Sequence, residues 1–354
     1  MITKKGWASQ FMFGAYKKEA AFGAGVTMDA TNACSMRGFD AEITMPDVVM
    51  NDKDEVTGAE FGTTQEIIAS RLEINYKEAK AKPNTVAFLS ALVLGASAST
   101  KDGAFNAWKH KITRVAAGTA QPSTQAEFKV GGLQYSAKGI KGKSLKISAA
   151  DSGLVSVEAG LMGAGDRATS ATAFVPVITE SFLKVNQAKF WMENGSSISV
   201  AATLTQDAQN ISSGTPVSLG ARLKSFELSY DNALEGQVGF GGAGLYQDID
   251  CGRRKAELKF SLLFNDATEL NHYLNQNPLA VEFDLKGALI AAGGTMYYGV
   301  QLIVPRFMLK AAPWPKGGAN DKLTIDMEAD IQDDGTNSPV IVEVYTAKAA
   351  YLAA

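Results

Sequence analysis

Two glycine-rich stretches come closest to a phosphate-binding motif. Residues 239–244 read GFGGAG and match GxGxxG, a pattern in which backbone N–H groups cradle a pyrophosphate where a helix begins. The LYQDIDCGRR that follows has no helical periodicity, so a flexible loop is the favoured interpretation. Residues 139–144, GIKGKS, lack the first glycine of a P-loop, because Ala137 stands there, and the next residues are strand-like. Neither stretch predicts a nucleotide site.

The other side chains that could do chemistry are few and scattered. His110 and His272 fall in different halves of the chain, and so do Cys34 and Cys251. A zinc site or a nucleophilic triad needs such groups to be brought together, and their spacing does not predict this. The acidic residues between 47 and 55 lack the regular spacing and central glycine of a calcium loop. We therefore predict no enzyme activity, no cofactor and no metal site.

The overall charge argues against a surface that holds nucleic acid. The chain has 354 residues, with 37 acidic and 34 basic side chains and a net charge of −3. Charged residues are only 20% of the total, which suits extensive subunit interfaces but also suits a well-packed monomer. The longest apolar run, residues 85–96, is too short to span a membrane, and the first residues do not resemble a signal peptide. We expect no membrane association and a reduced, cytosolic site of synthesis.

Alternating apolar and polar residues predict a mainly β first half. A strand at residues 36–43 is followed by a long loop at 44–65 and a second strand at 70–79. A short helix over residues 85–94 should follow, capped by Asn84 or Thr85 and ended by Gly95. Further strands are expected at residues 104–114, 127–135, 144–148 and 154–160.

The second half is organised around residues 222–285, which repeat this order more clearly. A strand with alternating burial is followed by a glycine-rich loop from Asp231 to Arg254, a second strand, a helix from Asp266 to Leu274 and a third strand. Later strands are expected at 297–304, ending at Pro305, and at 323–331 and 340–345. Residues 194–220 predict a strand plus a flexible loop.

This repeat predicts two domains. The first covers residues 36–165 and the second 176–354, with the small and polar residues 166–175 as the linker. Residues 1–35 form an arm whose aromatic side chains must be buried, either on its own domain or on a neighbour. These side chains are Trp7, Phe11, Phe13, Tyr16 and Phe22.

Several segments resemble a known family. SFELSYDNALEGQVGFGG, QDIDCGRRKAELKFSLLFND, the helix ELNHYLNQ, LAVEFDL and the stretch from residue 298 to 346 resemble the C-terminal half of tail tube proteins of long-tailed, siphovirus-like bacteriophages, in their two-domain form. KEAAFG at residues 18–23 and EVTG at 55–58 resemble the N-terminal half of that family. Residues 101–123 and 194–220 do not match the pattern and are interpreted as decorations.

The resemblance implies a mainly β fold and a role in assembly. It implies two tandem β-sandwich or barrel domains, each with a short flanking α-helix, whose sheets join those of neighbours into a closed β-barrel ring. Stacked homotrimeric rings would form a helical assembly, the virion tail tube, through which DNA passes during genome ejection without stable binding. The partners implied are further copies of the chain and the tape-measure, tail terminator and distal tail proteins. The protein would be made in the host cytoplasm.

Two groups of residues are candidates for this role. Apolar side chains in the two long loops should make inter-subunit or inter-ring contacts, together with the arm: Val48, Val49, Met50, Phe61, Val238, Phe240, Leu245 and Tyr246. The polar faces of two strands should line the lumen: Arg71, Glu73, Asn75, Glu257, Lys259 and Ser261. The alternative hypothesis is a phage or bacterial carbohydrate-binding or adhesin β module, which should show an aromatic cluster at a groove.

Overall fold

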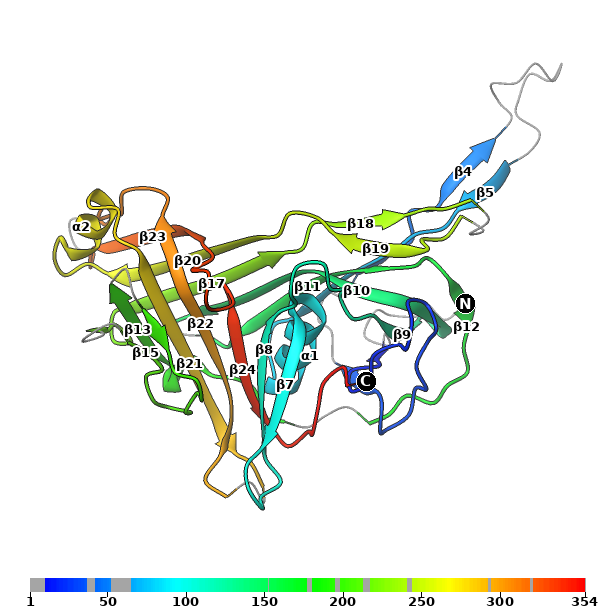
Figure 1. Cartoon of the computed structure of the whole chain (residues 1–354), viewed down its shortest axis with the longest axis horizontal. Coiled ribbons are helices and arrows are strands. Elements are labelled where there is room, and N and C mark those ends of the chain that lie inside the picture. Colours follow the sequence, from blue (N-terminus) through cyan, green and yellow to red (C-terminus); the bar gives the residue numbers. More distant parts are fainter. Residues whose placement is uncertain are drawn as a thin grey trace.

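The fold is mainly β, with two α-helices in the described part, α1 (Pro83–Leu94) and α2 (Thr268–Leu274). Figure 1 shows long strands side by side across the body, with α2 at one end and the hairpin of β4 (Val48–Asn51) and β5 (Gln65–Ala69) projecting from the other. The computed structural model describes residues 10–36, 42–51, 65–151, 153–176, 180–194, 198–212, 217–240, 244–291, 294–318 and 321–353.

Seven antiparallel pairings connect the strands of the first half. One sheet has the order β2–β1–β9–β10–β12 and another has the order β3–β6–β11–β10, so the long strand β10 belongs to both. The bounds are β1 (Gln10–Phe13), β2 (Cys34–Met36), β3 (Glu42–Thr44), β6 (Leu72–Glu78), β9 (Thr124–Val130), β10 (Leu133–Ala150), β11 (Ser156–Gly163) and β12 (Arg167–Thr169).

The second half repeats these seven pairings. Its sheets have the orders β16–β13–β21–β22–β24 and β17–β20–β23–β22, with β22 in the place of β10. The bounds are β13 (Lys189–Asn194), β16 (Val217–Ser218), β17 (Leu223–Asp231), β20 (Lys255–Leu263), β21 (Leu279–Leu289), β22 (Tyr297–Leu309), β23 (Thr324–Ile331) and β24 (Ile341–Thr346). Four smaller elements join them: η2 (Val185–Gln187), β14 (Ser199–Val200), β15 (Ile211–Ser212) and the hairpin of β18 (Leu234–Gln237) and β19 (Asp248–Cys251).

Two strand pairings join the halves. β10 pairs with β17 over seven rungs, from Ser144 opposite Asp231 to Ala150 opposite Ser225. β8 (Trp108–Arg114), which forms a hairpin with β7 (Gly95–Lys101), pairs with β24. A path followed from strand to strand does not return to its start within the described residues, so these residues of one chain form no closed barrel.

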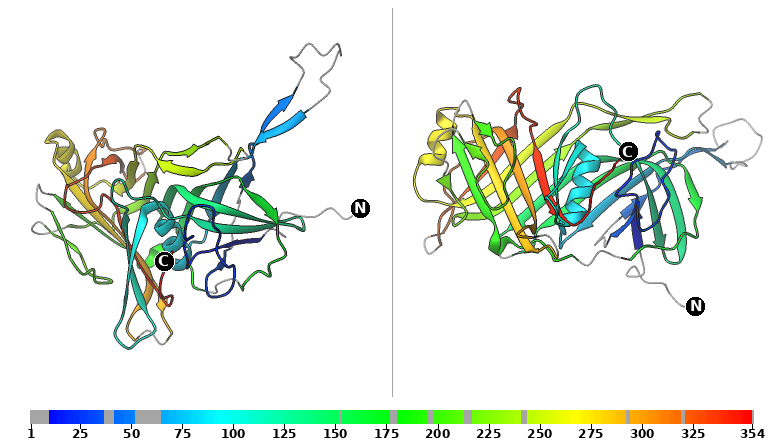
Figure 2. Two further views of the ribbon diagram at one scale, coloured as in Figure 1. Left: turned by 45° about the vertical axis from the view of Figure 1, so that its right-hand side comes forward. Right: turned by 60° about the horizontal axis from the view of Figure 1, so that its bottom comes forward.

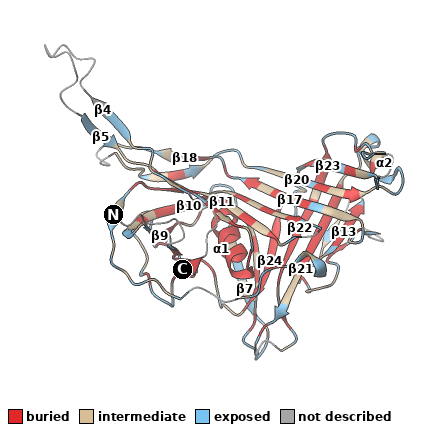
Figure 3. Ribbon diagram, turned by 180° about the vertical axis from the view of Figure 1, so that it is seen from behind, coloured by how far each residue is buried: buried red, intermediate tan, exposed pale blue. Residues whose placement is uncertain are grey.

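The core of the second half lies between its two sheets. Phe226 and Phe283, from facing sheets, stack with ring centroids 4.5 Å apart. Phe190 and Phe260 lie 5.4 Å apart across the same space, and Phe307 meets Phe260 edge to face. Along several of these strands, buried residues alternate with less buried ones, as Figure 3 shows. One face of the sheet formed by β17, β20 and β23 is thus fixed in the core, and its other face carries the less buried residues. Strands β21, β22 and β24 are largely buried on both faces.

Helix α1 fills the space between the halves. All its residues are buried, and it packs against β10, β24, β8 and β7. It begins two residues earlier than predicted, because Pro83 occupies its first turn and Lys82 is the N-cap. Asn84 is therefore not the cap: its backbone N–H donates to Glu180 Oε2 at 3.0 Å and its side chain to the Tyr16 hydroxyl at 2.9 Å. The end at Gly95, with φ of 94°, is as predicted.

Three other local predictions need correction. Residues 44–65 are not simply a loop, because they contain β4, which pairs with β5 from Gln65 onward. β22 does not end at Pro305: it continues to Leu309, and the proline lies where its partner changes from β24 to β23, so the missing N–H falls between two ladders. Residues 194–220 include the paired strands β14 and β15. They are attached to β21 through Glu282, whose carboxylate accepts hydrogen bonds from Asn210 and Ile211.

The described part of the arm folds into its own chain. β1 and β2 pair with each other and β1 pairs with β9, while Phe11, Phe13 and Tyr16 are buried. Trp7 lies outside the described residues. The segment predicted as linker contains part of β12, which pairs with β10. The domain bounds themselves stay a prediction.

Candidate lumen face and contact surfaces

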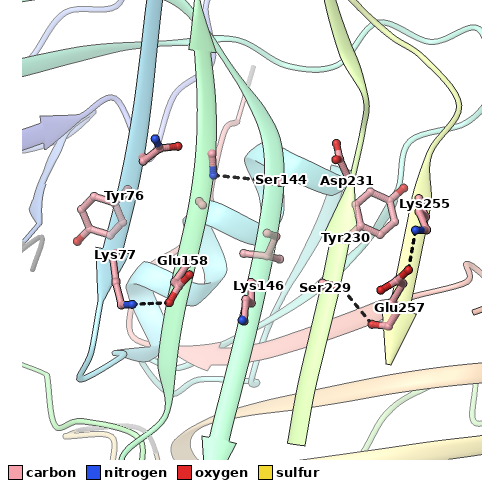
Figure 4. Close-up of a pocket in the computed structure, with 14 residues that line it drawn as sticks. Tyr76, Lys77, Ser144, Lys146, Glu158, Ser229, Tyr230, Asp231, Lys255 and Glu257 are labelled. Atoms are coloured by element: carbon pink, nitrogen blue, oxygen red, sulfur yellow. Dashed lines mark hydrogen bonds and ion pairs between the residues drawn. The ribbon is translucent and has the colours of Figure 1, made fainter. Parts of the chain in front are cut away.

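One polar sheet face runs across both halves of the chain. Strands β6, β11, β10, β17, β20 and β23 lie in this order, and on each of them buried residues alternate with partly or fully exposed polar ones. Figure 4 shows side chains of this face around a hollow of about 510 Å³ that lies where the halves meet. The face is thus continuous over the β10–β17 junction.

The lysines of this face are paired with carboxylates. The pairs cross from strand to strand: Lys77–Glu158 at 2.8 Å, Lys146–Glu227 at 2.8 Å, Lys259–Glu328 at 2.5 Å and Lys310–Glu257 at 2.9 Å, with Lys255–Glu257 at 2.6 Å along β20. Hydrogen bonds from Lys255 and Lys310 lower the pKa of Glu257 to about 2. Glu328 raises the pKa of Lys259. The face is charged but locally neutralised.

Five of the six lumen candidates share this face: Glu73, Asn75, Glu257, Lys259 and Ser261. Arg71 does not join them. Its guanidinium donates to Gly244 O at 2.5 Å and lies 4.2 Å from the centre of the Tyr246 ring. The spacing of Arg71 and Glu73 suggested a common face, but the contact with a loop distant in sequence decides the position of Arg71.

The two hairpins at the end opposite α2 carry exposed apolar side chains. On β4–β5 these are Val48, Val49, Ile67 and Ile68, each between 43% and 59% exposed. On the β18–β19 hairpin Val238 is exposed, and Phe240 is fully exposed at the tip. An isolated two-stranded hairpin is marginal in water, so this surface suits burial against another chain. Figure 2 shows β4–β5 standing away from the body.

The remaining contact candidates divide into two groups. Leu245 and Tyr246 are half-buried, and the Tyr246 N–H donates to Ala164 O at 2.9 Å. Phe61 and the side chain of Met50 lie outside the described residues. The buried Lys141 ties β19 to β10 by contacts of 2.7 Å to Asp248 and 2.8 Å to Ile249 O. The base of this hairpin is therefore fixed within the chain, while Val238 and Phe240 beyond β18 are exposed.

The residues first considered for chemistry lie apart and have structural partners. His110 is buried between the hydroxyls of Ser99 and Thr346, and burial lowers its pKa to about 4. Cys34 is buried, while the Cys251 thiol donates to Gln121. Residues 139–144 lie within β10, and GFGGAG is followed by β19. The described residues contain no cluster of three metal-ligating side chains. Their helices are all too short or too polar to cross a membrane.

The described residues thus form a β-rich fold with one continuous polar sheet face. Over residues 14–331 the chain matches the model of the family described as phage tail tube protein, and it belongs to that family. The family is structural, and its place is the virion tail. No curated protein matches the chain. The resemblance found in the sequence is confirmed, and the alternative of a carbohydrate-binding or adhesin module is not favoured.

Proposed function

We propose that this chain polymerises into stacked rings whose joined sheets form a closed barrel, the conduit for genome ejection. The observation that carries the proposal is the polar sheet face, which continues across β10 and β17 without a break. Electron microscopy of the purified protein tests it, since rings or tubes are expected. A protein that stays monomeric and binds glycans would instead support the adhesin alternative.

The ring should contain three chains. Each chain supplies two sets of strands with the same seven pairings, so three chains give six similar units with pseudo-sixfold symmetry. Light scattering of isolated rings, together with top views in the microscope, measures the number of chains. Rings of six chains would contradict this stoichiometry.

The polar face should line the lumen, where DNA slides past without being held. Each fixed cation that contacts a phosphate adds affinity through counterion release, and such contacts would multiply from ring to ring. The lysines named above are already paired with carboxylates. Purified tubes should therefore show no DNA retention in a shift assay at physiological salt.

A variant tests which face DNA meets. Glu158→Gln, Glu227→Gln and Glu328→Gln together would remove three negative charges that lie beside Lys77, Lys146 and Lys259, so tubes of this variant should retain DNA. The matched control is Asp333→Asn, which frees Arg114 on β8, outside this face. Retention by the control but not by the triple variant would place the lumen elsewhere.

The two hairpins should make the contacts between subunits and rings. Deleting residues 51–61 should leave a folded chain that no longer polymerises, and tubes of normal length from this deletion would count against the idea. Val49→Asp and Phe240→Asp test the described residues of each hairpin. Tape-measure, tail terminator and distal tail proteins are proposed as partners at the ends and inside of the tube, to be tested by co-purification.

A further inference from the structure

We propose that the outer edge of the second half, formed by the end of β22 and residues 310–316, binds β3 of a second copy of this chain. The register would be the one that β10 and β17 adopt within the chain. The inference rests on the proposed ring assembly and adds the contact by which one chain meets the next. Its basis is the repeat: β22 stands in the place of β10, and β3 stands in the place of β17.

The strand pairings within each half indicate which residues of the first half correspond to which residues of the second. Ile74 on β6 and Leu258 on β20 are both buried, and each lies between two apolar partners on the neighbouring strands. Matching these rungs pairs the halves residue by residue. It places Ile43 with Leu228, Thr44 with Ser229 and Gly160 with Glu328.

The same rungs relate the end of β22 to β10. Ser144 lies opposite Gly160 on β11. Lys310 lies opposite Glu328 on β23, where its backbone N–H donates to the Glu328 carbonyl at 2.8 Å. Lys310 is therefore the counterpart of Ser144. Lys316 bridges Thr324 on β23 as Ser148 lies opposite Ser156 on β11, so Lys316 is the counterpart of Ser148.

The junction inside the chain then predicts the junction between chains. Ser148 pairs with Glu227 across β10 and β17. By the same register, Lys316 of one copy pairs with Glu42 of the next. Both residues are exposed in the single chain. Ser144 opposite Asp231 likewise predicts that Lys310 pairs with Pro46.

The surface at this edge suits burial. Trp314 is 68% exposed, and it borders an apolar pocket of about 190 Å³ that includes Pro313, Pro315 and Leu270. Proline is tolerated at sheet edges because it lacks the N–H that a central strand needs. Within the chain, the corresponding edge of β10 is covered by β17. A second copy of the chain is the occupant that presents the same kind of strand.

Cross-linking between two chains, each with one added cysteine, tests the register. Glu42→Cys and Lys316→Cys are made separately in a Cys251→Ser background, in which the remaining Cys34 is buried. The variants are mixed, assembled and treated with a short reagent that bridges two thiols, because facing Cβ atoms in a sheet lie about 4.5–5.5 Å apart. The mixture should give a species of twice the chain mass, at least several-fold above either variant alone. The matched control is one chain carrying Lys146→Cys and Ser229→Cys, which should link internally with or without assembly.

The outcomes separate this proposal from the proposed function. Pro46→Cys mixed with Lys310→Cys tests the same register with a second pair. Tubes that assemble from both mixtures without the linked species would overturn the assignment of this edge and leave the conduit function standing. A wild-type chain that forms neither rings nor tubes would overturn the conduit function and this contact with it.

Discussion

The two helices hold the same place in the repeated strand order but differ in burial. Both follow the strand that enters the core, β6 for α1 and β20 for α2. All twelve residues of α1 are buried, whereas Glu269 is the one buried residue of α2. α1 is covered by β24 of the other half and by the β7–β8 hairpin. Among the described elements, α2 packs mainly against β22, and Leu274 is 64% exposed.

This difference shows what the single chain lacks. β24 corresponds to β12 in the repeat, since each pairs with the long strand shared by two sheets. If the second half meets the next chain as the first half meets the second, β12 of that chain approaches α2. The β7–β8 hairpin has no counterpart after α2, because only residues 275–278 separate α2 from β21. The junction between chains would therefore have fewer strand pairings than the junction within one.

The largest expected effect is on the covered helix. Phe88 is fully buried in α1, with its ring 5.5 Å from that of Phe13. Phe88→Ala should lower the free energy of unfolding by about 3–5 kcal/mol, because it removes buried apolar surface and leaves a cavity. Urea unfolding of the unassembled chain, followed by circular dichroism, measures this. Leu274→Ala is the control in α2 and should change stability by less than about 0.5 kcal/mol. Equal losses would mean that both helices are equally covered.

A second change tests how closely α1 approaches β10. A Cβ on Gly142 would lie 2.6 Å from a Val93 methyl carbon and 2.8 Å from the Val93 backbone. Gly142→Ala should therefore cost about 1–3 kcal/mol, since the helix must move. At Gly153 the nearest atom would be 3.6 Å away, so Gly153→Ala should be neutral or slightly stabilising. A neutral Gly142→Ala in the same urea assay would show that the helix is loosely held.

Individual strands and helices could be predicted from the sequence better than the contacts between them. Alternation in β6, β17, β20 and β23 and the presence of both helices could be predicted, because each is a local pattern of burial. The cap of α1 was missed because Asn84 serves a tertiary contact with Tyr16. The full length of β10 was missed because Gly139 and Gly142 resemble breaks, whereas one allows a positive φ and the other lets α1 approach.

Non-local pairing limited the prediction of the candidate site. The polar faces of β6 and β20 follow from their periodicity, so five of the lumen candidates share one face. No local pattern shows that β10 pairs with β17 or β8 with β24, and the first of these pairings makes the face continuous. Arg71 illustrates the same limit, because its partners Gly244 and Tyr246 are far away in the sequence.

The carboxylates at the two helix N-termini should respond to pH in opposite ways. Burial raises the pKa of Glu180, which accepts the Asn84 N–H, to about 7, whereas hydrogen bonds from Thr268 lower the pKa of the exposed Asp266. A raised carboxyl pKa means that the folded state binds more protons, so the Glu180 contribution should weaken as pH rises from about 4.5 to 7.

Glu180→Gln should remove that part of the pH dependence. Between about pH 5 and pH 7.5 it should reduce the loss of stability by on the order of 1–3 kcal/mol. Asp266→Asn is the control: the stabilisation from a lowered carboxyl pKa is lost only as pH falls through that pKa, so this variant should leave the interval unchanged. Unfolding midpoints at the two pH values measure both. An unchanged slope in Glu180→Gln would show that this carboxylate is ionised throughout.

The smallest effect on the single chain is expected at the exposed helix, where the consequence for assembly should be largest. Leu274→Asp places a charge on a surface that is wet in the monomer, so the unfolding free energy should change by less than about 0.5 kcal/mol. If the next chain covers α2 as β24 covers α1, the same charge must lose its water in the ring, which is costly without a partner. We expect a folded chain that forms few or no tubes by electron microscopy. Leu133→Asp, at the equally exposed β9–β10 turn, is the matched control. Normal tubes from Leu274→Asp would show that α2 stays exposed in the assembly, and that the two helices differ for a reason unrelated to the next chain.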